Sequence, residues 1–387
     1  MAFIYTRSQL KTRVNAMIQG RIGMLIDEDE TMNDSVREAH SLVDMKSTRR
    51  KNTLVPSLFN GIFDYQCPTD MEDYKIIDIP AQAKRYDGEF TLVPTEEFDR
   101  KKELGSIAID DFNNIRVLKI ASRVPSNEVL FSELDSLTSG GGTWIAFGDG
   151  TNLRADIDDY IKGNGSLAWD INAAAGTTAG IQNTGLSTID ITDYLGGNGS
   201  VFVWAKINNT TGLTNFILRI GSSAADYYQK TITVKNDGTA FTSGWNLLRF
   251  DLTSLTTVGA PVNTTINYAA IYMTKAITKV SETDYKFDWL VFKRGLTSEV
   301  KYYSNFGWTT SAGAYIQNST SDTDLLVAGD IEYDLVQKVA AVRAAKEADL
   351  GENKINELEK DRDAAVANYR LNNPSEAKIM VSTYYEY

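Results

Sequence analysis

The sequence predicts a multidomain α+β protein, in which a discontinuous helical domain with short strands is interrupted by an inserted all-β jelly-roll sandwich. Apolar residues recur at helical spacing near both ends of the chain. The middle consists of short aromatic or β-branched runs separated by Gly, Asn and Asp. A glycine triplet at residues 140–142 marks a linker between the two patterns.

Composition bounds what the chain can be. With 387 residues it is long enough for more than one hydrophobic core, and 42% apolar with 23% charged residues is globular composition. The net charge of −12 argues against a protein that grips DNA, because phosphate contacts need clustered cations. The one basic run, residues 49–51, is interpreted as a solvated turn, with a nucleic-acid contact as the alternative.

Cysteine use and hydropathy suggest where the chain is made. Cys67 is the only cysteine, which excludes an intramolecular disulfide and fits synthesis in a reducing compartment. No apolar h-region follows the first basic residues, and no apolar run approaches membrane-spanning length. We therefore expect no signal peptide and no membrane contact.

Two helices are predicted at the start of the chain. The apolar faces comprise Leu10, Val14, Met17 and Ile18 in the first helix, and Met32, Val36, Ala39 and Val43 in the second. Gly20 and Gly23 weaken the first helix, and Thr31 or Asn33 is the expected start of the second. Between residues 52 and 120 the pattern changes to short extended pieces, with strands expected at 75–79 and 115–120.

Residues 143–295 have the composition of an all-β domain. The predicted strands are 166–171, 201–207, 216–220, 231–234, 245–250, 270–273 and 285–292. Many short strands with turn residues between them favour a sandwich or jelly roll over βαβ units.

Helix returns after a final predicted strand pair at 300–303 and 314–317. The two apolar faces comprise Ile331, Leu335, Val339 and Val342, then Ile355, Leu358, Ala365 and Tyr369. Asp330 is the expected N-cap of the first helix, and Pro374 ends the second. The helical ends are expected to pack together, which divides the chain into residues 1–138, 139–295, 296–373 and an extended tail, 374–387.

No catalytic constellation is evident, so we expect no enzyme. His40 is the sole histidine, too few for a zinc site, and we expect it on the surface of its helix rather than in a catalytic triad. No nucleophile elbow or phosphate-binding glycine loop is present. Acidic clusters at 156–159 and 110–111 leave glycoside hydrolysis open on paper, with solvated turns as the favoured interpretation.

Two other residue sets could bind a ligand. Asp251 and Asp288 lie in strand patterns, where carboxylates can join backbone carbonyls around Ca²⁺, so they are candidate calcium ligands with structural hydrogen bonding as the alternative. Apart from Ca²⁺, no cofactor is expected. The tryptophans of the β domain favour core packing, with sugar-stacking platforms as the alternative; they are Trp144, Trp169, Trp204, Trp245 and Trp289.

The β domain resembles the jelly rolls of carbohydrate-binding modules. The resemblance rests on GSLAWDI (165–171), ITDYL (191–195), VFVW (201–204), GWNLLRFDL (244–252) and YKFDWLVF (285–292). It implies a sandwich fold over residues 143–295, whether or not a sugar is bound.

The flanks resemble the head–tail connector (adaptor, neck or collar) proteins of tailed bacteriophages. The resemblance rests on the opening helix, the segment FDYQCPTDMEDYKIIDI (63–79), DTDLL (322–326) before a long helix, and PSEAK (374–378). It implies a structural virion protein, assembled in the host cytoplasm, that forms a ring of about a dozen copies against a portal or neighbouring neck or tail protein. DNA would pass through without specific binding. The alternatives are a receptor- or glycan-binding tail fibre or decoration protein and, less favoured, a glycoside-active enzyme with a sugar-binding module.

The tail is too apolar and aromatic for a purely solvated end. We expect it to dock on a neighbouring ring component, and the alternative is that it packs on its own domain. Its candidate interface residues are Ile379, Val381, Tyr384, Tyr385 and Tyr387.

Overall fold

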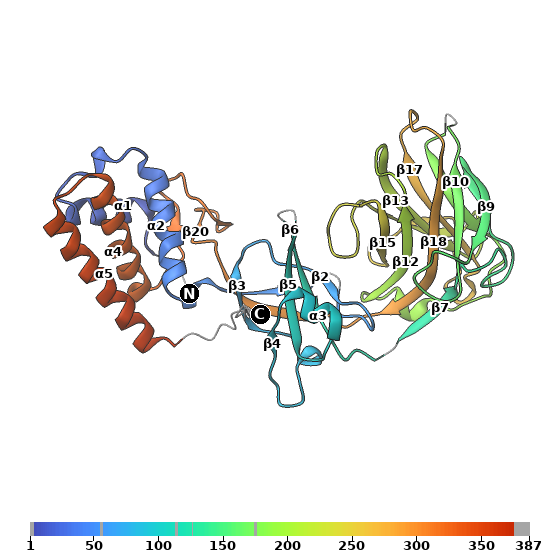
Figure 1. Ribbon diagram of the computed structural model, residues 1–387, viewed down its shortest axis with the longest axis horizontal. Helices are drawn as coiled ribbons and strands as arrows, with labels where there is room; N and C mark the ends of the chain where they lie inside the picture. The colour runs from blue at the N-terminus through green and yellow to red at the C-terminus, as the bar shows by residue number, and fades with distance from the viewer. Residues whose placement is uncertain (1–3, 55–56, 113–114, 126, 174–175, 375–387) are drawn as a thin grey trace, which may run out of the picture.

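A computed structural model describes residues 4–54, 57–112, 115–125, 127–173 and 176–374. Figure 1 shows three bodies in a row: a helical body at one end, a small β body in the middle, and a β-sandwich at the other end. The fold is a multidomain α+β architecture, as predicted.

The helical body joins both ends of the chain. Its helices are α1 (Arg7–Met17), α2 (Glu28–Leu42), α4 (Asp330–Glu347) and α5 (Glu352–Asn372). Leu10 and Val14 of α1, Val36 of α2 and Val339 of α4 are fully or almost fully buried in one core. The predicted packing of the two helical ends against each other is therefore confirmed.

Two predicted helix starts were wrong. The N-cap of α2 is Asp27, whose side chain accepts a hydrogen bond from the Glu30 amide at 2.9 Å. Thr31 lies inside the helix and donates its hydroxyl hydrogen to the Asp27 carbonyl, while Asn33 binds the Ser319 backbone. Three acidic residues in the first turn of α2 complement the helix dipole, which favours the earlier start.

In α4 the cap is Gly329, and Asp330 is already helical. The Glu332 side chain accepts a hydrogen bond from the Gly329 amide at 2.7 Å and so satisfies this helix end. Ile331 is 54% exposed, so it does not belong to the buried stripe that its spacing predicted.

The middle body contains two small sheets. The first sheet has the strand order β1 (Arg49–Thr53), β19 (Glu299–Ser304), β3 (Met71–Asp78). The second sheet has the strand order β2 (Asp64–Gln66), β6 (Ile115–Ile120), β5 (Ser106–Phe112), β4 (Thr91–Leu92). Helix α3 (Thr95–Lys101) follows β4 in the chain. Residues 49–51 therefore form a strand, not the solvated turn that was predicted. Likewise, β19 does not pair with residues 314–317; β20 (Trp308–Thr309) pairs with β21 (Tyr315–Ile316) and with β22 (Leu325–Leu326).

The sandwich consists of two antiparallel sheets. The first, here called the β12 sheet, has the order β15 (Gly244–Asp251), β12 (Gly199–Ile207), β18 (Glu282–Arg294), β10 (Ser166–Ile171), β9 (Gly150–Asp156), with β7 (Glu128–Ser132) also paired to β18. The second, the β13 sheet, has the order β16 (Thr256–Val258), β14 (Tyr227–Ile232), β13 (Leu213–Gly221), β17 (Tyr268–Lys275), β11 (Thr178–Asn183), β8 (Ile145–Gly148). Their facing side chains, including Trp169, Phe216 and Phe287, form a single core.

The glycine triplet is a packed turn, and the linker prediction was wrong. A Cβ on Gly140 would lie 2.5 Å from the Phe131 carbonyl oxygen, and its φ is +79°. The Ser139 carbonyl accepts a hydrogen bond from the Trp144 indole at 3.0 Å, which ties the turn to the sandwich core. β7 precedes this turn yet belongs to the β12 sheet.

The sandwich packs directly on the middle body. Phe202 on the outer face of β12 meets Phe59 edge to face, with ring centroids 5.0 Å apart. The middle-body core continues onto the sandwich through Phe202 and Val291. Part of the outer face of the β12 sheet is therefore covered, whereas the corresponding face of the β13 sheet carries an aromatic cluster of its own.

Candidate functional site

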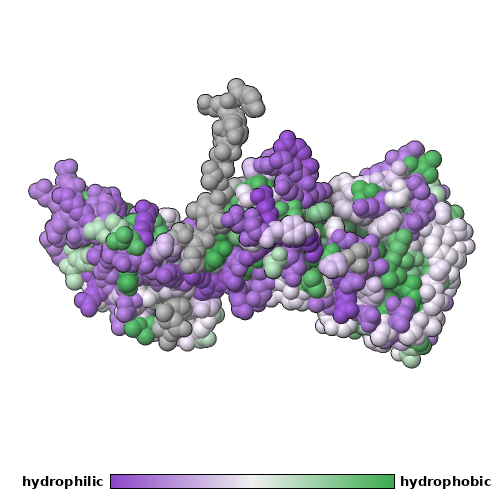
Figure 2. All heavy atoms as spheres, turned by 90° about the horizontal axis from the view of Figure 1, so that it is seen from below, coloured by the Kyte–Doolittle hydropathy of each residue, from purple (hydrophilic) through white to green (hydrophobic). Residues whose placement is uncertain are grey.

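An aromatic platform lies on the outer face of the β13 sheet. In β17, Ala269, Ile271 and Met273 point into the sandwich core, so Tyr268 and Tyr272 point outward. Both rings are nevertheless almost fully buried, at 1% and 2% exposed. They form a separate cluster with Ala270 and with partly buried side chains of the neighbouring strands: Phe147, Ile217 and Tyr227. Figure 2 shows more apolar and neutral surface over the sandwich than over the helical body, which is mostly hydrophilic in this view.

Small residues keep the platform flat. Gly180 lies beside Tyr272 in the ladder, and a Cβ there would lie 2.2 Å from the Ile271 carbonyl oxygen. Gly221 lies beside Tyr268, and a Cβ there would lie 2.1 Å from the Asp226 carbonyl oxygen. Because neither strand raises a side chain at these positions, the rings can lie over the backbone of the adjacent strand.

Arg219 of β13 lies in the middle of the rings. Its guanidinium carbon is 4.7 Å from the ring centroid of Tyr227, 5.1 Å from that of Tyr272 and 5.9 Å from that of Phe147. The Arg219 Nε atom donates to Gln229 Oε1 at 2.9 Å. The guanidinium is therefore fixed in orientation by stacking and by one hydrogen bond.

The phenol groups of Tyr268 and Tyr272 stay protonated at neutral pH. Burial raises the pKa of both Tyr268 and Tyr272, and the nearby Arg219 charge only partly offsets this. Because Tyr268 and Tyr272 are almost fully buried, they form the base of the platform, and its surface consists of the partly buried side chains. Phe147 and Tyr227 supply aromatic rings at that surface, and Arg219 and Gln229 supply groups that can donate or accept hydrogen bonds. Such a surface can pack against the C–H face of a ring-shaped polar ligand and bind its hydroxyls.

The tryptophans considered from the sequence lie elsewhere. Trp144 and Trp169 are 1% and 0% exposed, which confirms core packing for these two. Trp204, Trp245 and Trp289 are only partly buried, so the core prediction was wrong for them. The sequence reasoning missed the platform because it considered only tryptophan; the spacing of Tyr268 and Tyr272 in one strand was the available signal.

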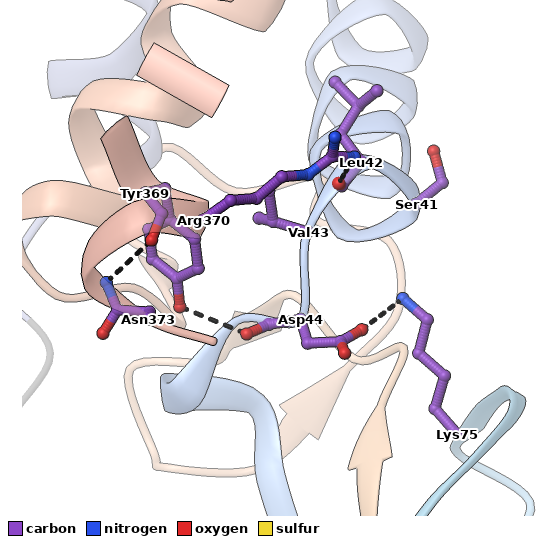
Figure 3. Close-up of a pocket in the computed structure, with 8 residues that line it drawn as sticks. All are labelled: Ser41, Leu42, Val43, Asp44, Lys75, Tyr369, Arg370 and Asn373. Carbon is purple, nitrogen blue, oxygen red and sulfur yellow. Dashed lines mark hydrogen bonds and ion pairs between the residues drawn. The ribbon is translucent and has the colours of Figure 1, made fainter. Parts of the chain in front are cut away.

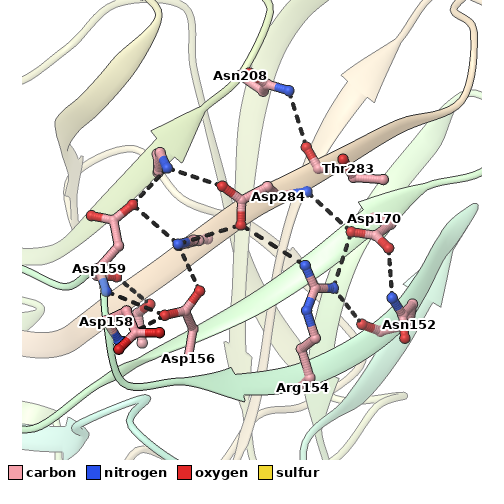
Figure 4. A network of polar contacts seen from close by, with 12 residues as sticks. Asn152, Arg154, Asp156, Asp158, Asp159, Asp170, Asn208, Thr283 and Asp284 are labelled. Atoms are coloured by element: carbon pink, nitrogen blue, oxygen red, sulfur yellow. Dashed lines mark hydrogen bonds and ion pairs between the residues drawn. The ribbon is translucent and has the colours of Figure 1, made fainter.

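The acidic cluster at 156–159 belongs to a polar network on the exposed part of the β12 sheet (Figure 4). Lys286 lies 2.7 Å from Asp156 and 3.0 Å from Asp159, and Lys206 bridges Asp159 and Asp284. Burial alone would raise the pKa of Asp159, but hydrogen bonds from Lys206, Trp245 and Lys286 hold it well below its usual value. The solvated-turn interpretation was therefore wrong for Asp159, which is cross-linked to three strands.

The network extends toward the edge of the same sheet. Arg154 lies 3.0 Å from Asp170, and Asn152 donates to the other oxygen of that carboxylate at 2.7 Å. Pairing with cations and amides lowers the pKa of both Asp159 and Asp170 and so favours their ionised forms.

The two candidate calcium ligands are not brought together. Asp251 stands opposite Ser200 in the ladder, and its Oδ1 accepts a hydrogen bond from Lys230 at 3.0 Å. Asp288 stands opposite Trp204, and its Oδ2 accepts hydrogen bonds from two backbone amides. Among the described residues no group of three or more His, Cys, Asp or Glu is placed to hold a metal ion. Calcium binding by either residue stays a prediction.

His40 is 3% exposed, so its expected place on a helix surface was wrong. Burial lowers its pKa to about 4, with the charges of Lys75 and Arg50 adding to the effect.

A pocket of about 420 Å³ lies where the helical and middle bodies meet (Figure 3). Lys75 pairs with Asp44 at 2.9 Å, and the Tyr369 hydroxyl donates to the Asp44 carbonyl at 3.2 Å. Arg370 donates to the Leu42 carbonyl at 2.7 Å. Because these polar groups satisfy one another across α2, α5 and β3, the pocket marks a structural joint between the two bodies.

The predicted tail interface, including Tyr384, Tyr385 and Tyr387, lies outside the described residues. In the part of the chain that is described, no helix is both long and apolar enough to cross a membrane.

No family model and no curated protein matches the sequence. Among solved structures, the chain is similar to the family 11 carbohydrate-binding module of a cellulosomal cellulase from Clostridium thermocellum, with 12% identity over 45% of this chain and 98% of that one, at a TM-score of 0.29. It is also similar to a family 30 module from the same organism, with 11% identity over 44% of this chain and 96% of that one, at a TM-score of 0.29.

A third similar structure is a Clostridium thermocellum xylanase fragment of CBM22-1 and GH10 modules complexed with xylohexaose, with 19% identity and a TM-score of 0.28. The match covers 44% of this chain and only 29% of that chain. At such identities the likeness concerns fold alone. The chain contains a β-sandwich that resembles carbohydrate-binding modules, together with helical segments.

Proposed function

We propose that the chain binds a saccharide on the aromatic platform of the β13 sheet. The observation that carries the proposal is the position of Arg219, fixed by Gln229 and surrounded by the rings of Phe147, Tyr227 and Tyr272. An arginine with a purely structural role usually pairs with a carboxylate. The neighbours of the Arg219 guanidinium described above are instead aromatic rings and the Gln229 amide.

The chemistry of the platform suits a neutral sugar. Sugar rings have an apolar C–H face and a rim of hydroxyls, which match aromatic faces bordered by fixed hydrogen-bonding groups. Arg219 and Gln229 are preorganised by their mutual hydrogen bond, so little side-chain ordering remains to be done on binding. The same arrangement offers no nucleophile or general acid, which supports a binding role rather than catalysis.

A glycan array with the full-length chain tests this proposal. The wild-type protein should bind a subset of glycans, Arg219→Ala should lose that binding, and Arg154→Ala should keep it. Arg154 is a matched control because it lies on the outer face of the other sheet and pairs with Asp170. Equal retention of binding by both variants would exclude the platform.

As a second candidate we propose that the flanking bodies anchor this module in a virion, as a non-enzymatic part of a head–tail connector ring. The resemblance of the flanks supports this, and so does an apolar tip between α1 and α2, where Met24 is 62% and Ile26 94% exposed. Exposed apolar residues of this kind suit a contact with another copy or a neighbouring ring protein. Light scattering combined with negative-stain imaging of the purified chain tests this proposal. A closed ring would support the connector role, an elongated trimer would favour the tail-fibre alternative, and a monomer would contradict both.

A further inference from the structure

We propose that the groove between the sandwich and the middle body is a second ligand site, and that it takes a carboxylated saccharide. The groove has a volume of about 480 Å³. Trp204 and Trp289 line it from the β12 sheet, and Phe63 and Lys102 line it from the middle body. Lys162, from the loop between β9 and β10, also lines the groove. The platform belongs to the other sheet of the sandwich, so the two sites are independent.

The backbone around the groove is built to present an indole. Phe202 pairs with Val291 and Trp204 pairs with Asp288, so Trp289 and Leu290 together stand opposite one residue of β12. This is a β-bulge, and Trp289 adopts a φ of +60° within it. Bulges re-aim side chains next to functional sites, and a left-handed conformation at tryptophan persists only where its surroundings enforce it.

Asp288 positions the opposite wall of the groove. Its Oδ2 accepts hydrogen bonds from the amides of Ile161 at 2.7 Å and Lys162 at 2.8 Å. The carboxylate is fully buried, so it acts on the ligand only through the loop it holds. Asp288 is thus a positioning residue for Lys162.

The charges of the groove favour an anion. Both acids in its lining are already paired: Asp64 with Lys119 at 3.2 Å, and Glu128 with Lys293. Lys102 and Lys162 are exposed, and neither forms an ion pair with a described residue. Lys102 Nζ lies 5.0 Å from the Phe63 ring centroid, which keeps this cation over the groove wall.

Aromatic rings beside two cations would also suit a single-stranded nucleic acid. The saccharide is favoured because Asp64 and Glu128 lie in the lining, where their oxygens can accept hydrogen bonds from the many hydroxyls of a sugar, which a DNA backbone does not offer. The net charge of −12 opposes a long chain of phosphates more strongly than a short saccharide with a few carboxylates.

Titration of the full-length chain with tri-galacturonate, followed by calorimetry and tryptophan fluorescence, tests the site. Saturable binding with a shift in indole emission is expected, and the Lys102→Gln/Lys162→Gln double variant should bind at least about tenfold more weakly. Neutral galactotriose should bind more weakly than tri-galacturonate to the wild-type protein. Arg219→Ala should leave tri-galacturonate binding unchanged, which separates this site from the platform.

Three results would overturn the proposal: no saturable binding of tri-galacturonate, equal affinity in the double-lysine variant, or loss of binding in Arg219→Ala. Tighter binding of oligothymidylate than of tri-galacturonate would assign the groove to nucleic acid instead. Because both lysines are exposed, their substitution leaves the fold intact, and matching melting curves of variant and wild type verify this.

Discussion

Asp288 accepts a hydrogen bond from the backbone amide of Lys162 at 2.8 Å while its own side chain is fully buried. Its second carboxylate oxygen, Oδ1, has no hydrogen-bond partner among the described residues. Burial raises the pKa of Asp288 to about 6, although the two amides that it binds oppose the shift. Asp288, which the sequence suggested as a calcium ligand, is therefore a buried carboxyl group whose raised pKa can be measured.

The raised pKa makes the sandwich less stable as pH increases. The folded state holds this proton up to about pH 6, whereas the unfolded state releases it near the ordinary aspartate pKa of 3.8. The stabilisation is therefore present in acid and is lost as the pH rises through that window. Asp288→Asn should remove this pH dependence, because asparagine does not ionise. The free energy of unfolding of the variant should exceed that of the wild type by on the order of 2 kcal/mol at neutral pH and differ little from it in acid. Chemical unfolding of both proteins below pH 4 and at neutral pH measures this difference in stability.

Asp251→Asn is the control, because this residue has the opposite shift. Burial would raise the pKa of Asp251, but hydrogen bonds from Thr253 and Lys230 hold it below its usual value. That variant should lose stability at neutral pH. A gain at neutral pH in both variants, or in neither, would contradict the role given to Asp288.

His40 predicts an acid sensitivity of the helical body. Its pKa is lowered to about 4 from 6.5, so the folded state binds fewer protons than the unfolded state between these values. Stability is then lost as pH falls through this window. His40→Leu should flatten the stability of the helices between about pH 6 and pH 4, since leucine cannot take up the proton. Helical circular dichroism during acid titration detects the difference, and parallel curves for the two proteins would refute it.

Because the strands lie close together at Gly180, adding a single methyl group there should destabilise the protein. A Cβ on Gly180 would lie 2.2 Å from a backbone oxygen and 2.5 Å from the Tyr272 Cα atom, so the sheet would have to separate locally. Gly180→Ala should lower the free energy of unfolding by about 1–3 kcal/mol. Gly196→Ala is the matched control, because a Cβ at Gly196 meets nothing within 4 Å. Equal melting temperatures for the two variants would contradict the packing described.

The spacing of apolar residues predicted the helices at the two ends of the chain, because helical periodicity depends only on residues that are close in sequence. The stripe containing Leu10 and Val14 and the one containing Val339 both lie in the helical core. Aromatic and β-branched runs likewise located β10, β12, β13, β15, β17 and β18. Strands β8, β9, β11 and β16 were not predicted, and the strand expected at 231–234 is β14, which begins earlier, at Tyr227. The start of the sandwich was not predictable, because β7 is recognisable as part of it only through its pairing with Leu290, Val291, Phe292 and Lys293.

The candidate sites were harder to predict, since each depends on contacts between distant segments. Lys286 and Asp159 are 127 positions apart in the sequence, yet their charged atoms lie 3.0 Å apart. Tyr268 and Tyr272 share a face within one strand, but both faces of β17 are apolar, so no alternation of polarity marks the outer one. The bulge at Trp289 has no sequence signature at all.

The most direct test of the central claim is calorimetric titration of a glycan selected on the array into wild-type protein and into Arg219→Ala and Arg154→Ala. Saccharide binding on the platform predicts an affinity loss of at least about tenfold, near 1.4 kcal/mol, in Arg219→Ala and wild-type affinity in Arg154→Ala. Unchanged affinity in Arg219→Ala, with both variants folded, would contradict it.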